Sequence, residues 1–163
     1  MVYKGTVLTV GALLERAQSV GSVPTYPGVG LRHDAAGNAL RCAVLLAEGS
    51  TLGDGWRFGI LQTLDDYESS KRRGGVQLAA QVFTAEPSRT GAIEIDAAFA
   101  ALAEYLAERD GWSAPSWTLD ASRAVSRWFA EVPTMFRADA ERESPRSFRS
   151  RGIYITDTSL ARA

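Results

Sequence analysis

The chain has 163 residues, a length that suits one domain and is sufficient to bury a sizeable hydrophobic core. Apolar residues make up 45% of it and charged residues 23%, close to the averages of globular proteins, which excludes a chain disordered throughout. The net charge of −1 gives the whole chain no attraction for nucleic acid or an anionic membrane, so such binding would need a local patch of charge.

One cysteine, Cys42, and one histidine, His33, restrict the redox and metal chemistry. A single cysteine forms no intramolecular disulfide, and a single histidine cannot supply a histidine-rich cluster, so we expect no metal and no other cofactor. No apolar run reaches 18 residues, and glycines interrupt the N-terminal stretch, so neither a membrane span nor a signal peptide is expected. These features predict a cytoplasmic protein.

Glycine and proline are frequent in residues 1–53, for which we expect a segment of uncertain structure ahead of a helical domain over residues 54–163. Two prolines fall within residues 21–30, a turn-rich stretch that does not favour a regular element. The apolar runs at 10–18 and 39–47 are too short for periodicity to separate a helix from a short strand, and part of the second run also suits a buried strand.

The next segments carry a clearer helical period. Residues 55–70 predict a helix, because Phe58, Leu61 and Leu64 recur at three-residue steps near one face. Basic residues followed by two glycines, at 71–75, suit the C-terminal end of that helix.

A further helix is expected over residues 76–85, ahead of Pro87. The strongest helical pattern covers residues 93–109, with alanines on its flanks and Gly111 as a stop signal. Its large apolar residues fall at i, i+4, i+7 and i+11, namely Ile95, Phe99, Leu102 and Leu106.

Beyond Pro115 the pattern predicts helices at 119–131 and 133–143 and a short helical turn within 144–152. Residues 153–155 are a β-like run, after which Thr156 or Asp157 would cap a last helical turn. Helices thus follow one another without a repeated βα alternation. The predicted fold class is mainly α, a compact helical domain with short strands as an alternative in the N-terminal segment.

The residue types of enzymes are present without a recognisable arrangement. His33 lies in a polar loop, no nucleophile elbow occurs, and Cys42 is expected to be a buried, inert thiol. Asp65, Glu68 and Asp96 are the carboxylates that a small enzyme would use. Neighbouring helical side chains point about 100° apart, so a solvated face is the simpler interpretation, and no catalytic or metal-binding residue is assigned.

Two basic clusters are candidates for contact with phosphate or with an acidic protein surface. Residues that could touch nucleic acid are Lys71, Arg72, Arg73 and Arg142. Further arginines follow at 146, 149 and 151, mixed with glutamates. Solvated or salt-bridged faces explain most runs of this kind.

Large aromatic residues punctuate the same C-terminal region. Trp117, Trp128, Phe129 and Phe136 most simply fill a helical core, because Trp and Phe dominate such cores. Their use as anchors in an interface is the second interpretation.

Four stretches of the C-terminal region carry a family resemblance: DAAFAALAEYLA at 96–107, APSWT at 114–118, RWF at 127–129 and SPRSFRSRGIYI at 144–155. The region resembles one found in many small actinobacterial proteins. Some of those proteins carry an N-terminal helix-turn-helix, and some are encoded beside nucleotidyltransferase-like toxins. The resemblance covers about 70 of the 163 residues and implies an antitoxin-like or regulatory partner protein that is not an enzyme.

The leading hypothesis is therefore a non-enzymatic protein-binding module, the antitoxin-like member of a bacterial toxin–antitoxin pair, which acts by occluding its partner. Aromatic anchors would bury in the partner while arginines pair with an acidic pocket. The expected partner-binding residues are Trp128, Arg146, Phe148, Arg149, Arg151 and Tyr154. A DNA-binding regulator and a small enzyme using surface carboxylates are the alternatives, and the oligomeric state stays open.

Overall fold

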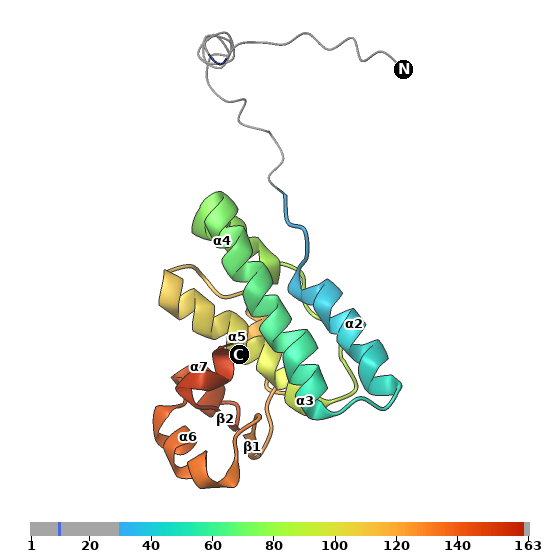
Figure 1. Ribbon diagram of the computed structural model, residues 1–163, viewed down its shortest axis with the longest axis vertical. Helices are drawn as coiled ribbons and strands as arrows, with labels where there is room; N and C mark the ends of the chain where they lie inside the picture. The colour runs from blue at the N-terminus through green and yellow to red at the C-terminus, as the bar shows by residue number, and fades with distance from the viewer. Residues whose placement is uncertain (1–9, 11–29, 162–163) are drawn as a thin grey trace.

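The computed structural model describes residue 10 and residues 30–161, which form a mainly helical fold (Figure 1). The α-helices of this part are α2 (Ala35–Ala47), α3 (Leu52–Gly55), α4 (Gln62–Ala80), α5 (Ile93–Asp110), α6 (Arg137–Glu143) and α7 (Arg146–Arg149). Shorter turns are the π-helix η1 (Trp56–Leu61) and the 3-10 helices η2 (Gln81–Phe83), η3 (Ser116–Leu119), η4 (Thr134–Phe136) and η5 (Asp157–Leu160). The predicted mainly α class is confirmed.

Helix α2 shows that the apolar run at 39–47 is helical and not a strand. Asp34 caps its N-terminus, because the carboxylate accepts a hydrogen bond from the N–H of Gly37 at 2.7 Å. Small buried residues follow at helical spacing, namely Ala35, Ala39 and Cys42, and they let α2 pack against η1 and α4. The run at 10–18 lies, apart from Val10, outside the described residues.

The helix predicted over 55–70 forms, but its buried face differs from the expected one. A π-helical turn at Trp56–Leu61 inserts an additional residue into the helix. The buried residues of this helix therefore include Trp56, Ile60, Thr63, Tyr67 and Ser70. Phe58, which the three-residue spacing placed on the buried face, is 50% exposed.

The expected break after the basic residues is also present. Gly75 has φ 76° and ψ −177°, so the path of α4 kinks there. The helical chain then continues only through η2 to Phe83, two residues short of the prediction.

Helix α5 matches its prediction to within one residue and lies at the centre of the fold. It ends at Gly111, which takes the left-handed conformation with φ 76°. Residues from Ile95 to Ala103 are buried on every side of the helix, because α3, α4, α7, η1, η3 and β2 all pack around it. Its many alanines permit this close approach. Figure 1 shows α4 in front of α5, with α2 to one side and the C-terminal elements gathered to the other.

The prediction of a helix over residues 119–131 is wrong. That stretch is irregular until strand β1 (Trp128–Phe129), which pairs in parallel with β2 (Ile153–Tyr154). The buried Arg123 side chain donates to the carbonyl oxygen of Pro87 at 2.5 Å and fixes the irregular path. Tertiary contacts here outweigh a weak local preference for helix.

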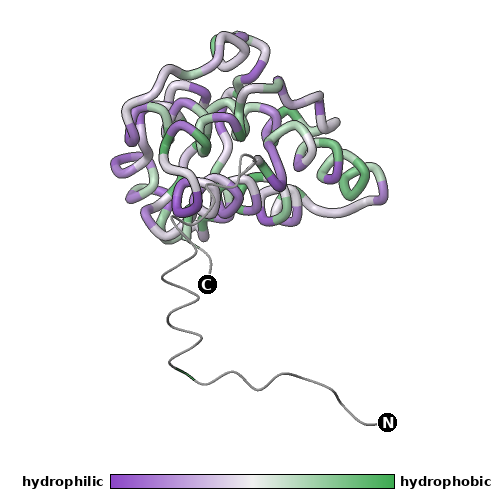
Figure 2. The backbone as a smooth tube through the Cα atoms, turned by 90° about the horizontal axis from the view of Figure 1, so that it is seen from above, coloured by the Kyte–Doolittle hydropathy of each residue, from purple (hydrophilic) through white to green (hydrophobic). Residues whose placement is uncertain are grey.

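The remaining C-terminal elements follow the predicted order. Helix formation after Pro133 gives η4 and α6, α7 lies within 144–152, and the β-like run becomes β2. Thr156 caps η5 as expected. Figure 2 shows hydrophilic and hydrophobic residues alternating along the coils of the tube. The buried apolar residues form one cluster that extends from Ala35 to Ile155 and joins α2 to the C-terminal elements.

Candidate functional site

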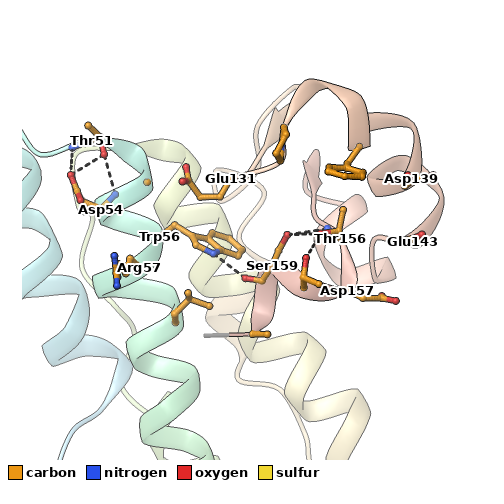
Figure 3. Close-up of a pocket in the computed structure, with 16 residues that line it drawn as sticks. Thr51, Asp54, Trp56, Arg57, Glu131, Asp139, Glu143, Thr156, Asp157 and Ser159 are labelled. Atoms are coloured by element: carbon orange, nitrogen blue, oxygen red, sulfur yellow. Dashed lines mark hydrogen bonds between the residues drawn. The ribbon is translucent and has the colours of Figure 1, made fainter. Parts of the chain in front are cut away.

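An open groove of about 830 Å³ lies between the α3–η1 segment and the C-terminal elements (Figure 3). One wall carries Thr51, Asp54, Trp56 and Arg57, and the opposite wall carries Pro133, Phe136, Asp139 and Glu143. Glu131 stands between the walls, and the turn η5 closes the base with residues 156–159. The groove thus joins segments that are distant in the sequence.

The groove is strongly acidic. Among the described residues that line it are five carboxylates, those of Asp54, Glu131, Asp139, Glu143 and Asp157, and one guanidinium, that of Arg57. Since the whole chain has a net charge of only −1, this negative charge is a local concentration. A cationic group is the complementary occupant.

The five carboxylates differ in how far the protein already satisfies them. Asp54 accepts hydrogen bonds from the backbone N–H of Thr51 at 3.0 Å and from its hydroxyl at 2.8 Å, and these bonds lower the pKa of Asp54. Asp139 pairs with Arg142 on α6. None of the described residues donates a hydrogen bond to Glu131, Glu143 or Asp157, so these three side chains can accept from a ligand.

Glu131 is held in the groove by an uncommon backbone conformation. With φ 54° it is the one non-glycine residue in the left-handed region within the described part of the chain. Buried residues on both sides, Ala130 and Val132, anchor that conformation. A Cβ at Gly53 would lie 2.8 Å from a carboxylate oxygen of Glu131, so glycine at this position gives the carboxylate its place beside α3.

Trp56, on the first wall, links the two sides of the groove. Its indole N–H donates to the carbonyl oxygen of Ser159 at 3.2 Å, which holds η5 against η1. The ring lies edge-on to Trp128 at a centroid distance of 5.8 Å and is only 2% exposed. The π-helix that begins at Trp56 therefore forms part of the site, a frequent role of such turns.

Exposed apolar side chains of η4 lie in and next to the groove. Phe136, expected in the core, is 47% exposed and lines the groove, and the neighbouring Met135 is 79% exposed. The placement of Phe136 in the core was wrong, because η4 lies on the surface and has no buried residue. Such side chains are typical anchors for a binding partner.

Two residues of the expected partner-binding set belong to the interior. Phe148 is fully buried and contacts Trp56 and Tyr105 at centroid distances of 6.3 and 6.1 Å. Arg151 is 8% exposed, donates to the carbonyl oxygens of Ser147 and Thr118, and forms an ion pair with Glu104 at 2.5 Å. Their physical role is to fasten α7 to α5 and η3.

The other four members of that set are only partly buried or are exposed. Trp128 is half-buried against Trp56, and Tyr154 stacks on Phe129 at a centroid distance of 5.2 Å. Arg146 and Arg149 are exposed on α7, where Arg146 approaches Glu108 at 3.3 Å. None of the six lines the groove.

The residues considered for nucleic-acid contact are partly engaged within the protein. Lys71 pairs with Asp110 at 2.9 Å, Arg73 donates to Ser70 at 3.2 Å, and Arg142 pairs with Asp139. Arg72 is exposed. The first three residues of this set lie on α4 and the fourth on α6.

The carboxylates considered for catalysis have separate structural roles. Glu68 pairs with Arg109 at 2.6 Å, and Asp96 accepts from the N–H and the hydroxyl of Thr90, each at 2.8 Å. Asp65 lies on α4, like Glu68. Within the described residues, no group of three His, Cys, Asp or Glu side chains is placed to hold a metal ion.

Sequence reasoning did not find the groove. Its charged residues come from four separate segments, and no local motif connects Asp54 or Glu131 with Asp157. The available signal was the acidic character of the stretch 131–143, which was interpreted only as a background for its arginines.

No protein-family model matches the chain, and no curated protein or solved structure is significantly similar to it. Among the described helices, none combines the length and the apolar character that a bilayer crossing requires. The function is therefore argued from the groove itself.

Proposed function

We propose that the protein is a non-enzymatic, cytoplasmic protein-binding module that receives a segment of a partner protein in the acidic groove. The observation that carries this proposal is the combination of an open groove of about 830 Å³, carboxylates without a donor among the described residues, and the exposed ring of Phe136 in its lining. Apolar anchors surrounded by polar groups are the usual anatomy of a protein interface.

The openness of the groove favours a protein segment over a small molecule. Small-molecule sites bury most of the ligand surface inside a concave pocket. This groove is bounded by two walls and a base and is open to solvent, so it can cover one side of an extended segment (Figure 3). A partner could then add contacts to Met135 beyond the groove.

The role of an antitoxin-like member of a toxin–antitoxin pair is the most specific form of the proposal. It comes from the resemblance of residues 95–163, and it fits a module that occludes a partner by holding one of its segments. The partner would then be a nucleotidyltransferase-like toxin. The exposed arginines of α7, Arg146 and Arg149, remain available for a second contact with that partner.

Co-expression of the full chain with the proteins encoded beside its gene tests the proposal. We expect the wild-type chain to co-purify with one of them and to relieve any growth inhibition that it causes. Glu143→Lys places a cation in the groove and should abolish both effects, whereas Glu48→Lys, at the exposed C-cap of α2 outside the groove, should not. A chain that is recovered alone and rescues nothing contradicts the proposal.

A further inference from the structure

We propose that the segment bound in the groove is basic and that an arginine side chain is its principal anchor. This inference rests on the proposed function, because it specifies the chemistry of the partner segment at the same site. It is carried by the charges of the groove walls and by the exposed ring of Phe136.

Charge complementarity gives the sign of the occupant. Glu131, Glu143 and Asp157 have no donor among the described residues, and of the described side chains that line the groove only that of Arg57 is cationic. An acidic segment or a nucleic-acid backbone would be repelled by these carboxylates. A cationic segment would instead supply the donors that they lack.

A metal ion is a poorer fit than a basic side chain. Calcium and magnesium require several oxygen ligands converging at about 2.0–2.6 Å. In the described part of the chain the carboxylates are not gathered into a group of three that could hold an ion. They are instead distributed along both walls, as Figure 3 shows for Asp54, Glu131 and Glu143, and this distribution suits a long side chain or several along a peptide.

The aromatic rim distinguishes arginine from lysine. A guanidinium can lie flat on an aromatic ring and still direct its N–H groups to carboxylates, whereas an ammonium is a compact, strongly hydrated charge. The Phe136 ring is 47% exposed on the same wall as Glu143. One residue along the chain but outside the groove, the Arg137 guanidinium lies 4.9 Å from the centroid of Phe129, an example within this protein of an arginine placed over an aromatic ring.

Peptide titration of the full, isotopically labelled chain tests the inference without knowledge of the partner. The probes are three synthetic peptides of equal length in which glycine and serine separate arginines, lysines or glutamates, added to millimolar concentration and followed by NMR chemical shifts. We expect the arginine peptide to shift the signals of groove residues, the lysine peptide to bind several-fold more weakly, and the glutamate peptide to have no effect. Raised salt should weaken the binding.

Variants with matched controls separate the contribution of the carboxylate charges to peptide binding from that of stacking on Phe136. Glu131→Gln combined with Glu143→Gln should weaken the arginine peptide about tenfold or more, which is the loss of about 1.4 kcal/mol, whereas Glu48→Gln should not. Phe136→Ala should bring the affinities of the arginine and lysine peptides close together. Because the wild-type comparison of the three peptides needs no variant, a poorly folded variant does not remove the test.

The outcomes distinguish this inference from the proposed function. If the arginine peptide shifts no groove signal, or shifts those of the double variant equally, the inference is overturned. If Glu143→Lys still abolishes co-purification in that case, the binding module stands and its partner segment has another chemistry. Peptide binding in the groove without any co-purifying partner would support the inference and remove the proposed function.

Discussion

At the scale of single residues, Gly152 is the position where the backbone and its neighbours leave the least freedom. Its φ is 74°, and a Cβ there would lie 2.0 Å from the carbonyl oxygen of Val125. Gly152→Ala should therefore lower the free energy of unfolding by about 3 kcal/mol or more, because strain and a backbone clash act together. Urea unfolding followed by tryptophan fluorescence measures the loss.

Gly111 is the matched control for this prediction. It has φ 76° at the end of α5, but a Cβ there would meet no atom within 4 Å. Gly111→Ala should cost only about 1 kcal/mol, the strain of the left-handed conformation alone. Equal losses in the two variants would show that the approach of Gly152 to Val125 is relaxed in solution.

Cys42 gives a chemical test at the same scale. Burial, with a smaller contribution from the charge of Asp96, raises the pKa of its thiol to about 11. At pH 8 only about one thiol in a thousand would then be the reactive thiolate. We expect negligible labelling by a disulfide reagent in the folded chain and prompt labelling in denaturant. Rapid labelling without denaturant would contradict the packing of α2 against η1.

Whether an individual residue is buried was predictable from the sequence where its residue type alone determines this. An inert Cys42 and a buried Trp117 follow from apolar residue type, and both are buried as expected. Phe136 and Arg151 show the limit, because one is a large aromatic on the surface and the other a charged residue in the interior. The exposed position of Phe136 depends on η4, and the buried position of Arg151 depends on carbonyl oxygens from distant segments. No local sequence pattern shows either of these.

At the scale of elements, a charged network joins α4 to the C-terminal end of α5. The Asp110 carboxylate, 8% exposed, accepts hydrogen bonds from Arg109 at 2.8 Å, Lys71 at 2.9 Å and the hydroxyl of Tyr67 at 2.7 Å. These bonds, led by that of Arg109, hold the pKa of Asp110 far below its usual range. Trp112 completes the network by donating to Tyr67 at 2.9 Å.

This network predicts a stability that decreases in acid. Because the pKa of Asp110 is lower in the folded chain than in the unfolded one, its contribution is complete above about pH 4 and is lost as the pH falls further. Asp110→Asn should cost about 1–3 kcal/mol at neutral pH, and its difference from the wild type should shrink toward pH 3. Urea midpoints at a series of pH values measure this, with Glu48→Gln as control. A difference that is constant with pH would contradict it.

Elements were predictable where their pattern is long and regular. The apolar period of α5 and Gly111 after it place both its ends to within one residue, because local signals mark this helix along its whole length. The π-turn at η1 and the irregular path of 119–127 were not predictable, because each depends on tertiary contacts: Trp56 with Ser159, and Arg123 with Pro87. The conformation of a short segment depends more on its tertiary contacts than on its intrinsic helix propensity.

At the scale of the whole molecule, the groove forms because the C-terminal residues pack against a segment nearer the middle of the chain. Residues 51–61 and 131–161 meet through Trp56, which the sequence places more than 70 residues from its partners. Sequence reasoning predicted binding by the C-terminal region and assigned its arginines and Phe148, which is buried, to that task. The carboxylates of the groove instead come from residues before and after those arginines, at 131–143 and at 157, and from Asp54 in α3.

Because the buried apolar residues form one continuous core, we expect α2 and the C-terminal elements to unfold together. Asn38 on α2 donates to Thr63 at 2.9 Å and to Asp66 at 2.8 Å, while Ser144 donates to the carbonyl oxygen of Ile155 at 3.0 Å. Asn38→Ala and Ser144→Ala should each cost about 1–3 kcal/mol and shift one shared transition in urea. Leu40→Ala, at a position 59% exposed on α2, should change it by no more than about 0.5 kcal/mol.

The measurement compares far-UV circular dichroism, which reports on all helices, with the fluorescence of tryptophans that lie outside α2. If one cluster of buried residues holds the molecule together, the two signals must coincide in every variant, because loss of α2 removes Cys42 from Gly59 and uncovers the ring of Phe99. An early change in circular dichroism that Asn38→Ala shifts alone would instead make α2 a separately melting part. The groove, whose α3 wall follows α2 directly in the chain, would then depend on α2 less than its packing implies.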